Sequence, residues 1–363
     1  MWNQTRVSKL AGVDYPVMQG PFGGNFSTAA LTAVVSNAGG IGGYGAYTLS
    51  PEAIYAEVQQ INALTNKPYN INLWVSDGDA PGAVITDAQY DKVKALYQPY
   101  FDELGIAVPD KPAPFQSRYE NQVQVILDVK PKVFSFVFGI PSAAVLEQCR
   151  KLGILTAGAA TTLAEALALD AAGVDMIVAS GFEAGGHRPS WLAPAEQSTM
   201  GTFVLTQLIK ERVKAPVIAA GGIANGKGIA AALTAGADAV QVGTAFLATE
   251  ESGAMPVHRD MLLSGDYTTI LTRAFTGRLG RGIVTKLAQD VIGKESSLLP
   301  FPVQSQFVSS LRKAAVEQER WDLVFFWSGQ AAPLLKHRRA AALMGSLVEE
   351  TDMIMERQRG SKA

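Results

Sequence analysis

The chain has 363 residues and a formal net charge of −2, with 48% hydrophobic and 18% charged residues. This balance predicts a large buried core and gives no electrostatic reason to expect nucleic acid or another polyanion as a partner. The single cysteine excludes an internal disulfide, and neither a signal-peptide pattern nor an apolar run approaching the roughly 18 residues of a membrane span is present. We therefore expect a cytoplasmic protein without membrane contact.

Short apolar runs alternate with helical patterns along the chain, which favours βαβ units and a parallel sheet. Eight strands separated by helices close naturally into a (β/α)₈ TIM barrel of the α/β class. An open doubly wound sheet is the alternative, although it rarely uses so many uniform units. The expected strands are Tyr15–Gln19, Gly40–Gly43, Tyr69–Val75, Val133–Phe138, Gly153–Ala157, Val174–Ala179, Pro216–Ala220 and Ala237–Val242.

Helix signals fill the intervals between these strands. A helix is expected over Ser27–Asn37, and another begins at the capping-box pattern of Thr162 and Glu165. There the hydroxyl accepts a bond from the backbone N–H of Glu165, and the carboxylate reaches back to the backbone of Thr162. This second helix is expected to end at Gly173 in a left-handed conformation, and residues 225–236 follow the same plan.

Two regions exceed a minimal barrel. We expect an insertion after the third strand and a helical tail that packs over the barrel mouth, so that the barrel occupies residues 1–252 and the tail residues 253–363. The insertion is Ser76–Phe115 with a helix near Ala88–Leu104, and the tail contains amphipathic stretches at Val308–Gln318 and Leu334–Met353.

Glycines follow the seventh and eighth strands and predict a phosphate site. The sequence AAGGI contains Gly221 and Gly222, and QVGTAF contains Gly243 and Thr244. Glycine lets backbone N–H groups approach an anion closely, and a helix that begins at Thr244 favours negative charge. Tight turns alone are the alternative, but two such loops at adjacent strands make a phosphate site the better interpretation.

His187 follows the sixth strand in the sequence SGFEAGGHR and is the candidate proton-transfer group. An imidazole at the barrel mouth can exchange a proton near neutral pH. An inert loop histidine is the alternative. His258 and His337 lie in the tail among basic and polar residues, and we expect both at the surface.

Other polar residues occupy positions where a ligand could be bound. Asn72 interrupts an apolar strand and Gln19 ends the first strand, where each could either contact a ligand or make a hydrogen bond inside the barrel. Trp327 and Gln330 in the tail could face a ligand or mark a helix terminus. Cys149 precedes the fifth strand, at the wrong end for a barrel nucleophile, and is interpreted as structural.

The chain resembles the nitronate monooxygenases, formerly called 2-nitropropane dioxygenases, and is most similar to their first class. The resemblance rests on PVMQGPFGG, NAGGIGGYGA, NINLWV, EAGGHR, AAGGIANG, QVGTAF and WSGQ, in matching order. It implies an FMN-dependent barrel with His187 as the catalytic histidine. The reaction that it implies needs no metal. The candidates for substrate contact are Arg188, Trp327 and Gln330, and Lys227 is a further candidate for binding an acid group of the substrate. The implied FMN-binding residues are Gln19, Gly20, Asn72, Ser180, Gly185, Gly221, Gly222, Gln241, Val242, Gly243 and Thr244.

One departure from the family pattern concerns Ser180, where the family often has a glutamine that contacts the flavin. The serine could reach the flavin through a water molecule, or another group could replace that contact.

The implied reaction oxidises an alkyl nitronate, such as propionate 3-nitronate, with dioxygen to a carbonyl compound and nitrite through a flavin semiquinone. His187 would accept the α-proton of a neutral nitroalkane, or, when protonated, hold the anionic nitro group. A homodimer is the candidate assembly.

Two alternatives remain open. The first is an FMN-dependent NAD(P)H:quinone or enoyl-thioester reductase with the same barrel, because nicotinamide use leaves no clear signature in such barrels. The second is a non-catalytic barrel that binds a phosphate ligand as a sensor or scaffold, against which the position of His187 argues.

Overall fold

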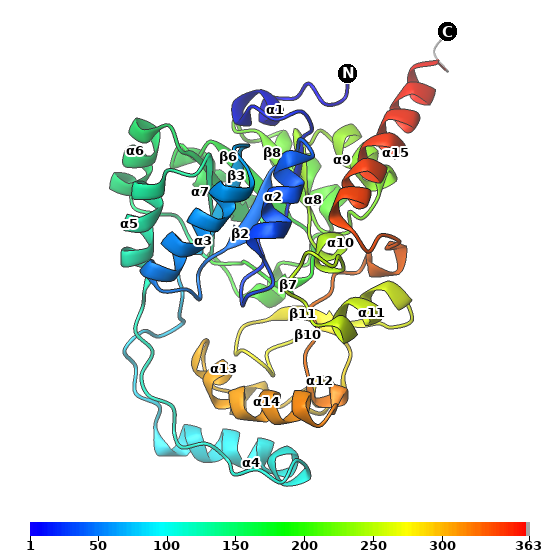
Figure 1. Ribbon diagram of the computed structural model, residues 1–363. Helices are drawn as coiled ribbons and strands as arrows, with labels where there is room; N and C mark the ends of the chain where they lie inside the picture. The colour runs from blue at the N-terminus through cyan, green and yellow to red at the C-terminus, as the bar shows by residue number, and fades with distance from the viewer. Residues whose placement is uncertain (361–363) are drawn as a thin grey trace.

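The expected barrel is confirmed in the computed structural model, which describes residues 1–360 (Figure 1). Eight parallel strands follow the order β1-β9-β8-β6-β5-β4-β3-β2. The ring closes where the N–H of Gln19 donates to the carbonyl of Ile41 (2.9 Å) and the N–H of Ile41 donates to Val17 (2.9 Å). The barrel strands are β1 (Val17–Gln19), β2 (Gly42–Gly45), β3 (Tyr69–Trp74), β4 (Val133–Val137), β5 (Leu155–Ala160), β6 (Met176–Ser180), β8 (Val217–Ala220) and β9 (Ala239–Val242).

The largest differences from the expected strand bounds occur at β2 and β5, which both begin two residues late and end two and three residues late, respectively. Gly153 has φ +73° and its N–H bonds to carbonyls at the end of the preceding helix, so it ends that helix instead of starting β5. Similarly, the N–H of Gly40 donates to the carbonyl of Val35 and belongs to the turn before β2. Glycine serves both turns and strands, and periodicity does not separate the two uses.

Helices cover the outside of the barrel and begin at the expected polar caps. Thr28, Thr162 and Asn225 each accept a bond from a backbone N–H three residues on. The helices are α2 (Ala29–Asn37), α3 (Pro51–Leu64), α5 (Tyr119–Val129), α6 (Ala143–Leu152), α7 (Leu163–Ala171), α8 (Thr202–Lys210), α9 (Gly226–Thr234) and α10 (Thr244–Leu247), with the 3₁₀ turn Ala195–Gln197 before α8.

Of the two hydrogen bonds expected in the capping box of α7, the one accepted by Thr162 is confirmed and the one accepted by Glu165 from the N–H of Thr162 is wrong. Thr162 caps α7 as expected, and Gly173 after the helix has φ +76°. The carboxylate of Glu165, however, accepts bonds from the N–H of Thr161 (2.7 Å) and of Trp191 (2.7 Å). It therefore ties the loop after β6 to α7, a long-range role that the local pattern does not contain.

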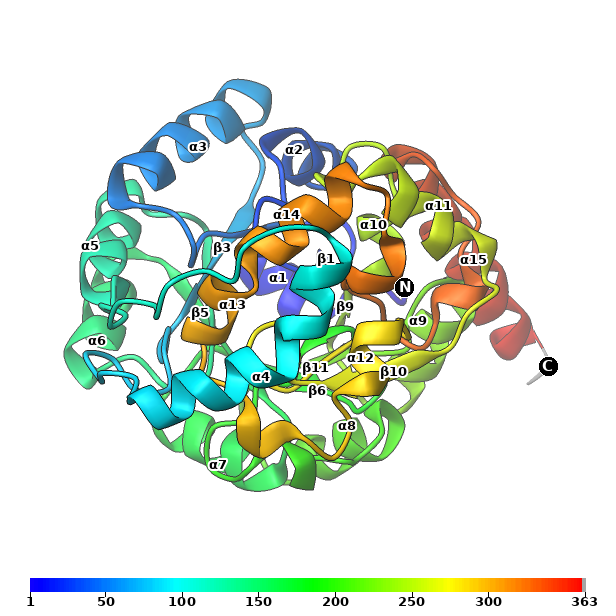
Figure 2. The same ribbon diagram turned by 90° about the horizontal axis from the view of Figure 1, so that it is seen from below.

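The barrel interior is filled at one end by α1 (Arg6–Ala11), whose Val7 and Ala11 pack with Met18 and Met176 in one buried cluster. The expected insertion and the first part of the tail lie at the opposite end (Figure 1). Seen from that end, α4 (Asp87–Glu103), α13 (Val303–Phe307) and α14 (Ser309–Glu317) cross in front of the barrel (Figure 2). The strands point their C-terminal ends toward this cover.

The insertion and the tail share one hydrophobic core, in which Tyr97 and Phe101 of α4 pack with Phe307 of α13. The tail is not purely helical, because β10 and β11 form an antiparallel sheet with β7 (Gly186–His187). Its elements are α11 (Pro256–Ser264), β10 (Thr269–Thr272), β11 (Gly280–Ile283), α12 (Lys286–Asp290), α13 (Val303–Phe307), α14 (Ser309–Glu317) and 3₁₀ turns at Glu295–Ser297, Trp321–Leu323 and Ala332–Leu334.

The chain ends in α15 (Ala340–Gly360), which returns to pack against α2 and α9 (Figure 1). It begins six residues after the expected start at Leu334, because residues 332–339 form a 3₁₀ turn and a loop. None of the helices within residues 1–360 is long and apolar enough to cross a membrane.

Candidate active site

His187 lies in β7, where the barrel meets the tail. It pairs with Gly280 of β11, and the N–H of the next residue, Arg188, donates to the carbonyl of Leu279 (2.9 Å). The loop that follows β6 is therefore fixed by a sheet with two tail strands. This places the histidine under the cover at the C-terminal end of the barrel, where barrel enzymes carry their chemistry.

The imidazole of His187 packs among aromatic rings from distant parts of the chain. Its centroid lies 4.7 Å from Trp327, 5.1 Å from Trp74 and 5.7 Å from Phe301. Its Nε2 atom lies 2.9 Å from Oγ1 of Thr276. We call these four neighbours together with His187 the histidine compartment. Trp327, a candidate for contact with a ligand, thus lies beside His187.

Arg278 supplies positive charge beside this compartment. Its guanidinium lies 4.2 Å from the ring centroid of Phe138 and 4.5 Å from that of Phe301, and it bonds to Oδ1 of Asp79 (2.6 Å) and to the carbonyl of Ser76 (2.8 Å). Burial and this guanidinium lower the pKa of His187 to about 3. The imidazole is therefore neutral at pH 7.

Arg188 was expected to contact substrate, and its side chain is instead enclosed in the loop. It is 2% exposed and its guanidinium donates to the carbonyls of Gly181 and Ser198. A buried guanidinium with these partners braces the backbone between β6 and α8. The cation whose charge acts on the histidine is instead Arg278, which comes from the tail.

Three glycine segments meet at the expected phosphate site. After β8, Gly221 and Gly222 have φ of +108° and +72°, and a Cβ on Gly221 would lie 3.0 Å from the backbone nitrogen of Ala184. After β1, a Cβ on Gly20 would lie 3.1 Å from Cα of Gly243, while a Cβ on Gly243 would find nothing closer than 3.9 Å. We call Gly20, Gly221, Gly222, Gly243 and Thr244 the glycine cradle.

The chemistry of the cradle fits a phosphate. In the short helix α10, the N–H groups of Phe246 and Leu247 donate to the carbonyl of Gly243, whereas no backbone partner is found within the described residues for those of Thr244 and Ala245. The absence of side chains at Gly222 and Gly243 leaves these backbone donors accessible to an anion. The residues present therefore fit the phosphate end of FMN.

The tail segment 327–330 joins the glycine cradle to the loop that runs from the end of β6 to His187, residues 181–187, which we call the histidine loop. The N–H of Gly329 donates to Oγ1 of Thr244 (2.9 Å), and the N–H of Gln330 donates to the carbonyl of Glu183 (3.0 Å). A Cβ on Gly185 would lie 2.5 Å from the backbone nitrogen of Gly329. Gly185, expected to contact the flavin, is thus a glycine that this tail segment requires for close packing.

Among the expected flavin-binding residues, alternation along the strands separates two groups. Asn72 lies on the interior face of β3, the same face as Asn70. Ser180 lies on the interior face of β6, the same face as Met176 and Val178. Gln241 shares the interior face of β9 with Ala239. These three residues could meet a ring that lies across the mouth. The amide of Asn72 donates to Oγ of Ser135 (2.9 Å).

Gln19 and Val242 point the other way. Gln19 is fully buried; its Nε2 donates to the carbonyl of Gly43 (2.7 Å) and its Oε1 accepts from the N–H of Gly43 (3.1 Å). Both ends of this amide close the barrel between β1 and β2, so the expected side-chain contact with flavin is not what the structure shows. Val242 packs under α2 and α9 with Val17 and Val240, which leaves only its backbone facing the cradle.

A cavity of ≈ 350 Å³ lies beside the glycine cradle, between α8 and α9. Gly221 and Gly222 line it, together with Phe203, Ile223 and Gln330. Gln330 is exposed and belongs to this cavity, whereas Trp327, three residues earlier, belongs to the histidine compartment. The two WSGQ candidates are therefore divided between the two parts of the site.

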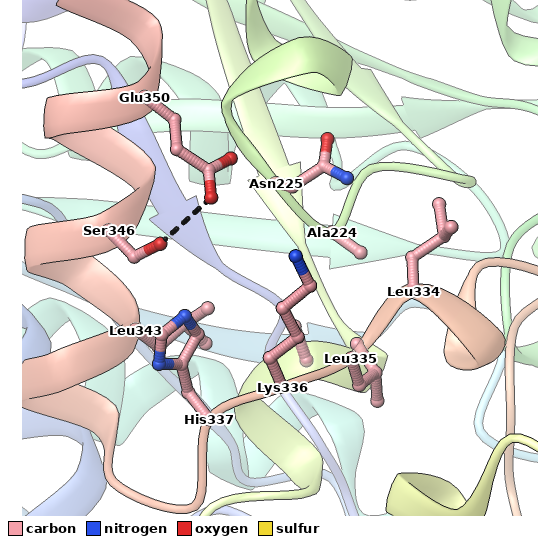
Figure 3. Close-up of a pocket in the computed structure, with 10 residues that line it drawn as sticks. Ala224, Asn225, Leu334, Leu335, Lys336, His337, Leu343, Ser346 and Glu350 are labelled. Atoms are coloured by element: carbon pink, nitrogen blue, oxygen red, sulfur yellow. Dashed lines mark hydrogen bonds between the residues drawn. The ribbon is translucent and has the colours of Figure 1, made fainter.

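His258 was expected at the surface and is buried. It is 1% exposed, its Nε2 lies 2.9 Å from the carbonyl of Trp327, and burial lowers its pKa to about 4. His337 is half-buried and lines a cavity of ≈ 10 Å³, close to one water molecule in size, between α9 and α15 (Figure 3). Across that cavity the carboxylate of Glu350 accepts bonds from Ser346 (3.1 Å) and from the N–H of Gly226 (2.9 Å).

Two remaining expectations concern single residues. Lys227 is exposed in the first turn of α9, in the helix layer outside the barrel. Cys149 is fully buried in α6, and burial raises the pKa of its thiol to about 11, which agrees with a structural role.

Sequence reasoning missed Tyr47, Trp74, Thr276, Arg278 and Phe301. Trp74 ends β3 on the interior face shared with Asn72, and its ring stacks on Tyr47 at 3.7 Å. That alternation was a usable signal. Thr276, Arg278 and Phe301 reach the site only because the tail folds over the mouth, and no local pattern in the tail indicates that contact.

Known proteins of one family match this chain over nearly its whole length. Residues 4–350 match the family model for nitronate monooxygenase. A probable nitronate monooxygenase of Staphylococcus aureus (strain JH9) is 34% identical over 98% of this chain and 99% of its own.

Two solved structures are also similar over nearly the full length. A nitroalkane oxidase from Streptomyces ansochromogenes superposes with a TM-score of 0.88 at 32% identity, covering 97% of this chain and 99% of its own. FabK from Thermotoga maritima superposes with a TM-score of 0.76 at 27% identity, covering 99% of each chain. On these matches, and with the histidine loop and glycine cradle both in place, the chain belongs to the nitronate monooxygenase family, a family of FMN-dependent oxidoreductases.

Proposed function

We propose that this protein binds FMN and oxidises alkyl nitronates with dioxygen to a carbonyl compound and nitrite. The observation that carries the proposal is the double attachment of one tail segment. Gly329 bonds to Thr244 in the glycine cradle, and the next residue, Gln330, bonds to Glu183 in the loop that ends in His187. The glycine cradle and His187 are thus attached to the same tail segment.

The glycine cradle would hold the FMN phosphate through backbone N–H groups. Asn72, Ser180 and Gln241, on the interior rows below the mouth, would meet the edges of the ring. When bound, FMN would supply the one-electron redox chemistry between the nitronate and dioxygen. The remaining contributions come from the histidine compartment.

Within that compartment, a neutral His187 is suited to accept a proton from a neutral nitro compound. A pKa of about 3 makes an imidazolium that holds the nitro group the weaker of the two roles implied by the family resemblance. We assign the attraction of an anionic substrate, such as propionate 3-nitronate, to Arg278 instead. Trp74, Phe301 and Trp327 surround the reacting group with apolar surface, which excludes water and strengthens that attraction.

The proposal is tested with His187→Asn, using His337→Asn as the matched control because His337 lies between α9 and α15. Nitrite release and oxygen consumption are measured with a neutral nitroalkane and, separately, with propionate 3-nitronate, and bound flavin is quantified from the visible spectrum. With the neutral nitroalkane we expect His187→Asn to keep its FMN and to lose about 10²–10⁴-fold in turnover, while His337→Asn stays near wild type and both variants still oxidise the preformed nitronate. Equal turnover of the neutral nitroalkane in both variants would refute the role of His187, and a wild-type protein that releases no nitrite from propionate 3-nitronate would refute the proposed function.

A further inference from the structure

The tail loop between β10 and β11 holds one nitrogen of His187. Nε2 of the imidazole lies 2.9 Å from Oγ1 of Thr276. Among residues 1–360 no hydrogen bond to the other nitrogen, Nδ1, is formed. The ring is therefore attached to its surroundings through Nε2, while Nδ1 keeps its bonding capacity for another molecule.

The Thr276 hydroxyl is already committed within its own loop. Its oxygen lies 3.1 Å from the carbonyl of Arg278, which can only accept, and it receives the N–H of Arg278 at 3.3 Å. A hydroxyl has one proton. When that proton goes to the Arg278 carbonyl, the oxygen is left as an acceptor toward His187, and Nε2 must carry the hydrogen of the bond between them.

The loop itself is held firmly, so Thr276 has a defined position. The N–H of Gly277 donates to the carbonyl of Arg273 (2.8 Å), and a Cβ on Gly277 would lie 2.6 Å from the carbonyl of Leu299. The side chain of Arg278 is fixed on the other side by Asp79 and Ser76. A hydroxyl in this setting can fix both the rotation of the imidazole and its tautomer.

We propose that Thr276 is a positioning residue that holds His187 as its Nε2–H tautomer and leaves the Nδ1 lone pair to accept the substrate proton. The proton-acceptor part rests on the proposed function; the tautomer does not. In the step itself the C–H bond of a neutral nitro compound breaks, its proton forms a bond with Nδ1, and the electron pair remains on the substrate as the nitronate. The product is then an imidazolium whose Nε2–H still donates to Thr276.

The charges around the ring agree with this assignment. Arg278 is the cation whose charge helps to lower the pKa of His187, and the carboxylate of its partner Asp79 accepts bonds from Nε of Arg278 and from the N–H of Phe301. Burial and Arg278 keep the pKa of His187 low, so one ring nitrogen is unprotonated before substrate arrives. A neutral partner such as Thr276 orients the ring without adding a negative charge that would raise this pKa.

The direct test is a nitrogen NMR spectrum of protein labelled with ¹⁵N-histidine, which contains only three histidines. Wild-type protein and the variants Thr276→Ser, Thr276→Val and Thr272→Val are compared at pH 7. Thr272→Val is the matched control, because its hydroxyl accepts from the N–H of Ala274 (3.1 Å) and does not reach His187. The His187→Asn protein assigns the signals.

We expect wild type, Thr276→Ser and Thr272→Val to show His187 with a protonated Nε2 and an unprotonated Nδ1. Thr276→Val leaves an Nε2–H without an acceptor, so the single tautomer should give way to a mixture and the Nε2 proton should exchange rapidly. A wild-type spectrum with protonated Nδ1, or a Thr276→Val spectrum unchanged from wild type, would overturn the proposal.

A kinetic comparison separates this inference from the proposed function. In Thr276→Val, the turnover of a neutral nitroalkane relative to its preformed nitronate should fall about tenfold, as for loss of one hydrogen bond in the proton-transfer step, and Thr276→Ser should restore it. An unchanged ratio would overturn the proton-acceptor role of Nδ1. Absence of all nitronate turnover in wild type would refute the proposed function. The tautomer of His187 would still be decided by the NMR spectrum.

Discussion

The backbone N–H of Gly329 donates a 2.9 Å hydrogen bond to Oγ1 of Thr244, the first residue of α10. Thr244 lies in the glycine cradle, and Gly329 lies two residues after Trp327, which contacts His187. This bond therefore connects the proposed phosphate site, the tail and the histidine compartment. Loss of the tail contact should consequently weaken cofactor binding, although the tail contributes no residue to the cradle.

The variant Thr244→Val tests this connection. It removes the acceptor for Gly329 and the hydroxyl offered to the phosphate, so FMN should bind about 10–100-fold more weakly, as for loss of a hydrogen bond to a charged group. Thr244→Ser keeps the hydroxyl and should bind FMN nearly as wild type. The dissociation constant of FMN is measured by flavin fluorescence on apoprotein. Equal affinity in all three proteins would show that this hydroxyl does not serve the cofactor.

Arg188→Met should destabilise the fold without changing substrate affinity. The substitution leaves the carbonyls of Gly181 and Ser198 without their donor inside the protein, which costs about 2–3 kcal/mol. Denaturant unfolding gives the stability, and steady-state kinetics gives the KM for propionate 3-nitronate. Arg212→Met, at an exposed residue, is the control. A large rise in KM at unchanged stability would show instead that Arg188 contacts the substrate.

His258 makes the stability of the protein depend on pH. Its pKa in the folded protein is about 4, below the ordinary value of 6.5, so the unfolded chain binds more protons between these values. The contribution of a neutral His258 is complete above pH 6.5 and is lost as the pH falls toward 4. At about 1.4 kcal/mol per pKa unit, the loss is on the order of 3 kcal/mol.

Unfolding curves between pH 7 and pH 4 check this contribution. His258→Gln can still donate to the carbonyl of Trp327 but does not titrate, so its stability should fall less steeply with pH than that of wild type. Parallel stability curves for the two proteins would contradict the assignment.

Replacing each of two glycines, one in α9 and one in the facing helix α15, by alanine should change the stability of the protein in opposite directions. A Cβ on Gly226 would lie 2.4 Å from Cβ of Glu350 in α15, so Gly226→Ala should force α9 and α15 apart and cost about 1–3 kcal/mol. Gly345 lies within α15, and a Cβ there meets nothing within 4 Å, so Gly345→Ala should stabilise the helix by about 0.5–1 kcal/mol. Thermal unfolding of both variants tests the pair. A stabilising Gly226→Ala would show that α15 does not pack this closely.

Local patterns in the sequence were enough to predict the barrel and one part of the site. Eight apolar runs gave the strands, and the glycines after β8 and β9 gave the cradle, because both depend on short stretches of chain. His187 could be chosen for its place after a strand. The strand boundaries at Gly40 and Gly153 could not be predicted, since glycine ends helices as readily as it starts strands.

The tail could not be predicted in the same way. The three-stranded sheet of β7, β10 and β11 depends on pairing over about 90 residues of sequence separation, where turn signals give no guidance. Arg188 and Arg278 both occupy glycine-rich stretches, and only the packing shows which one is enclosed and which one lies beside His187. Gln19 looked like a ligand-binding amide because its partner, the backbone of Gly43, lies on a neighbouring strand.

Anaerobic mixing of the purified protein with propionate 3-nitronate or with NADH distinguishes an FMN enzyme that oxidises nitronates from a nicotinamide-dependent reductase. We expect a yellow protein whose flavin spectrum is reduced by the nitronate, recovers in air with release of nitrite, and does not respond to NADH. Full bleaching by NADH with no response to the nitronate would contradict this account and assign the protein to the reductases. A colourless protein that cannot be loaded with FMN would contradict the cofactor as well.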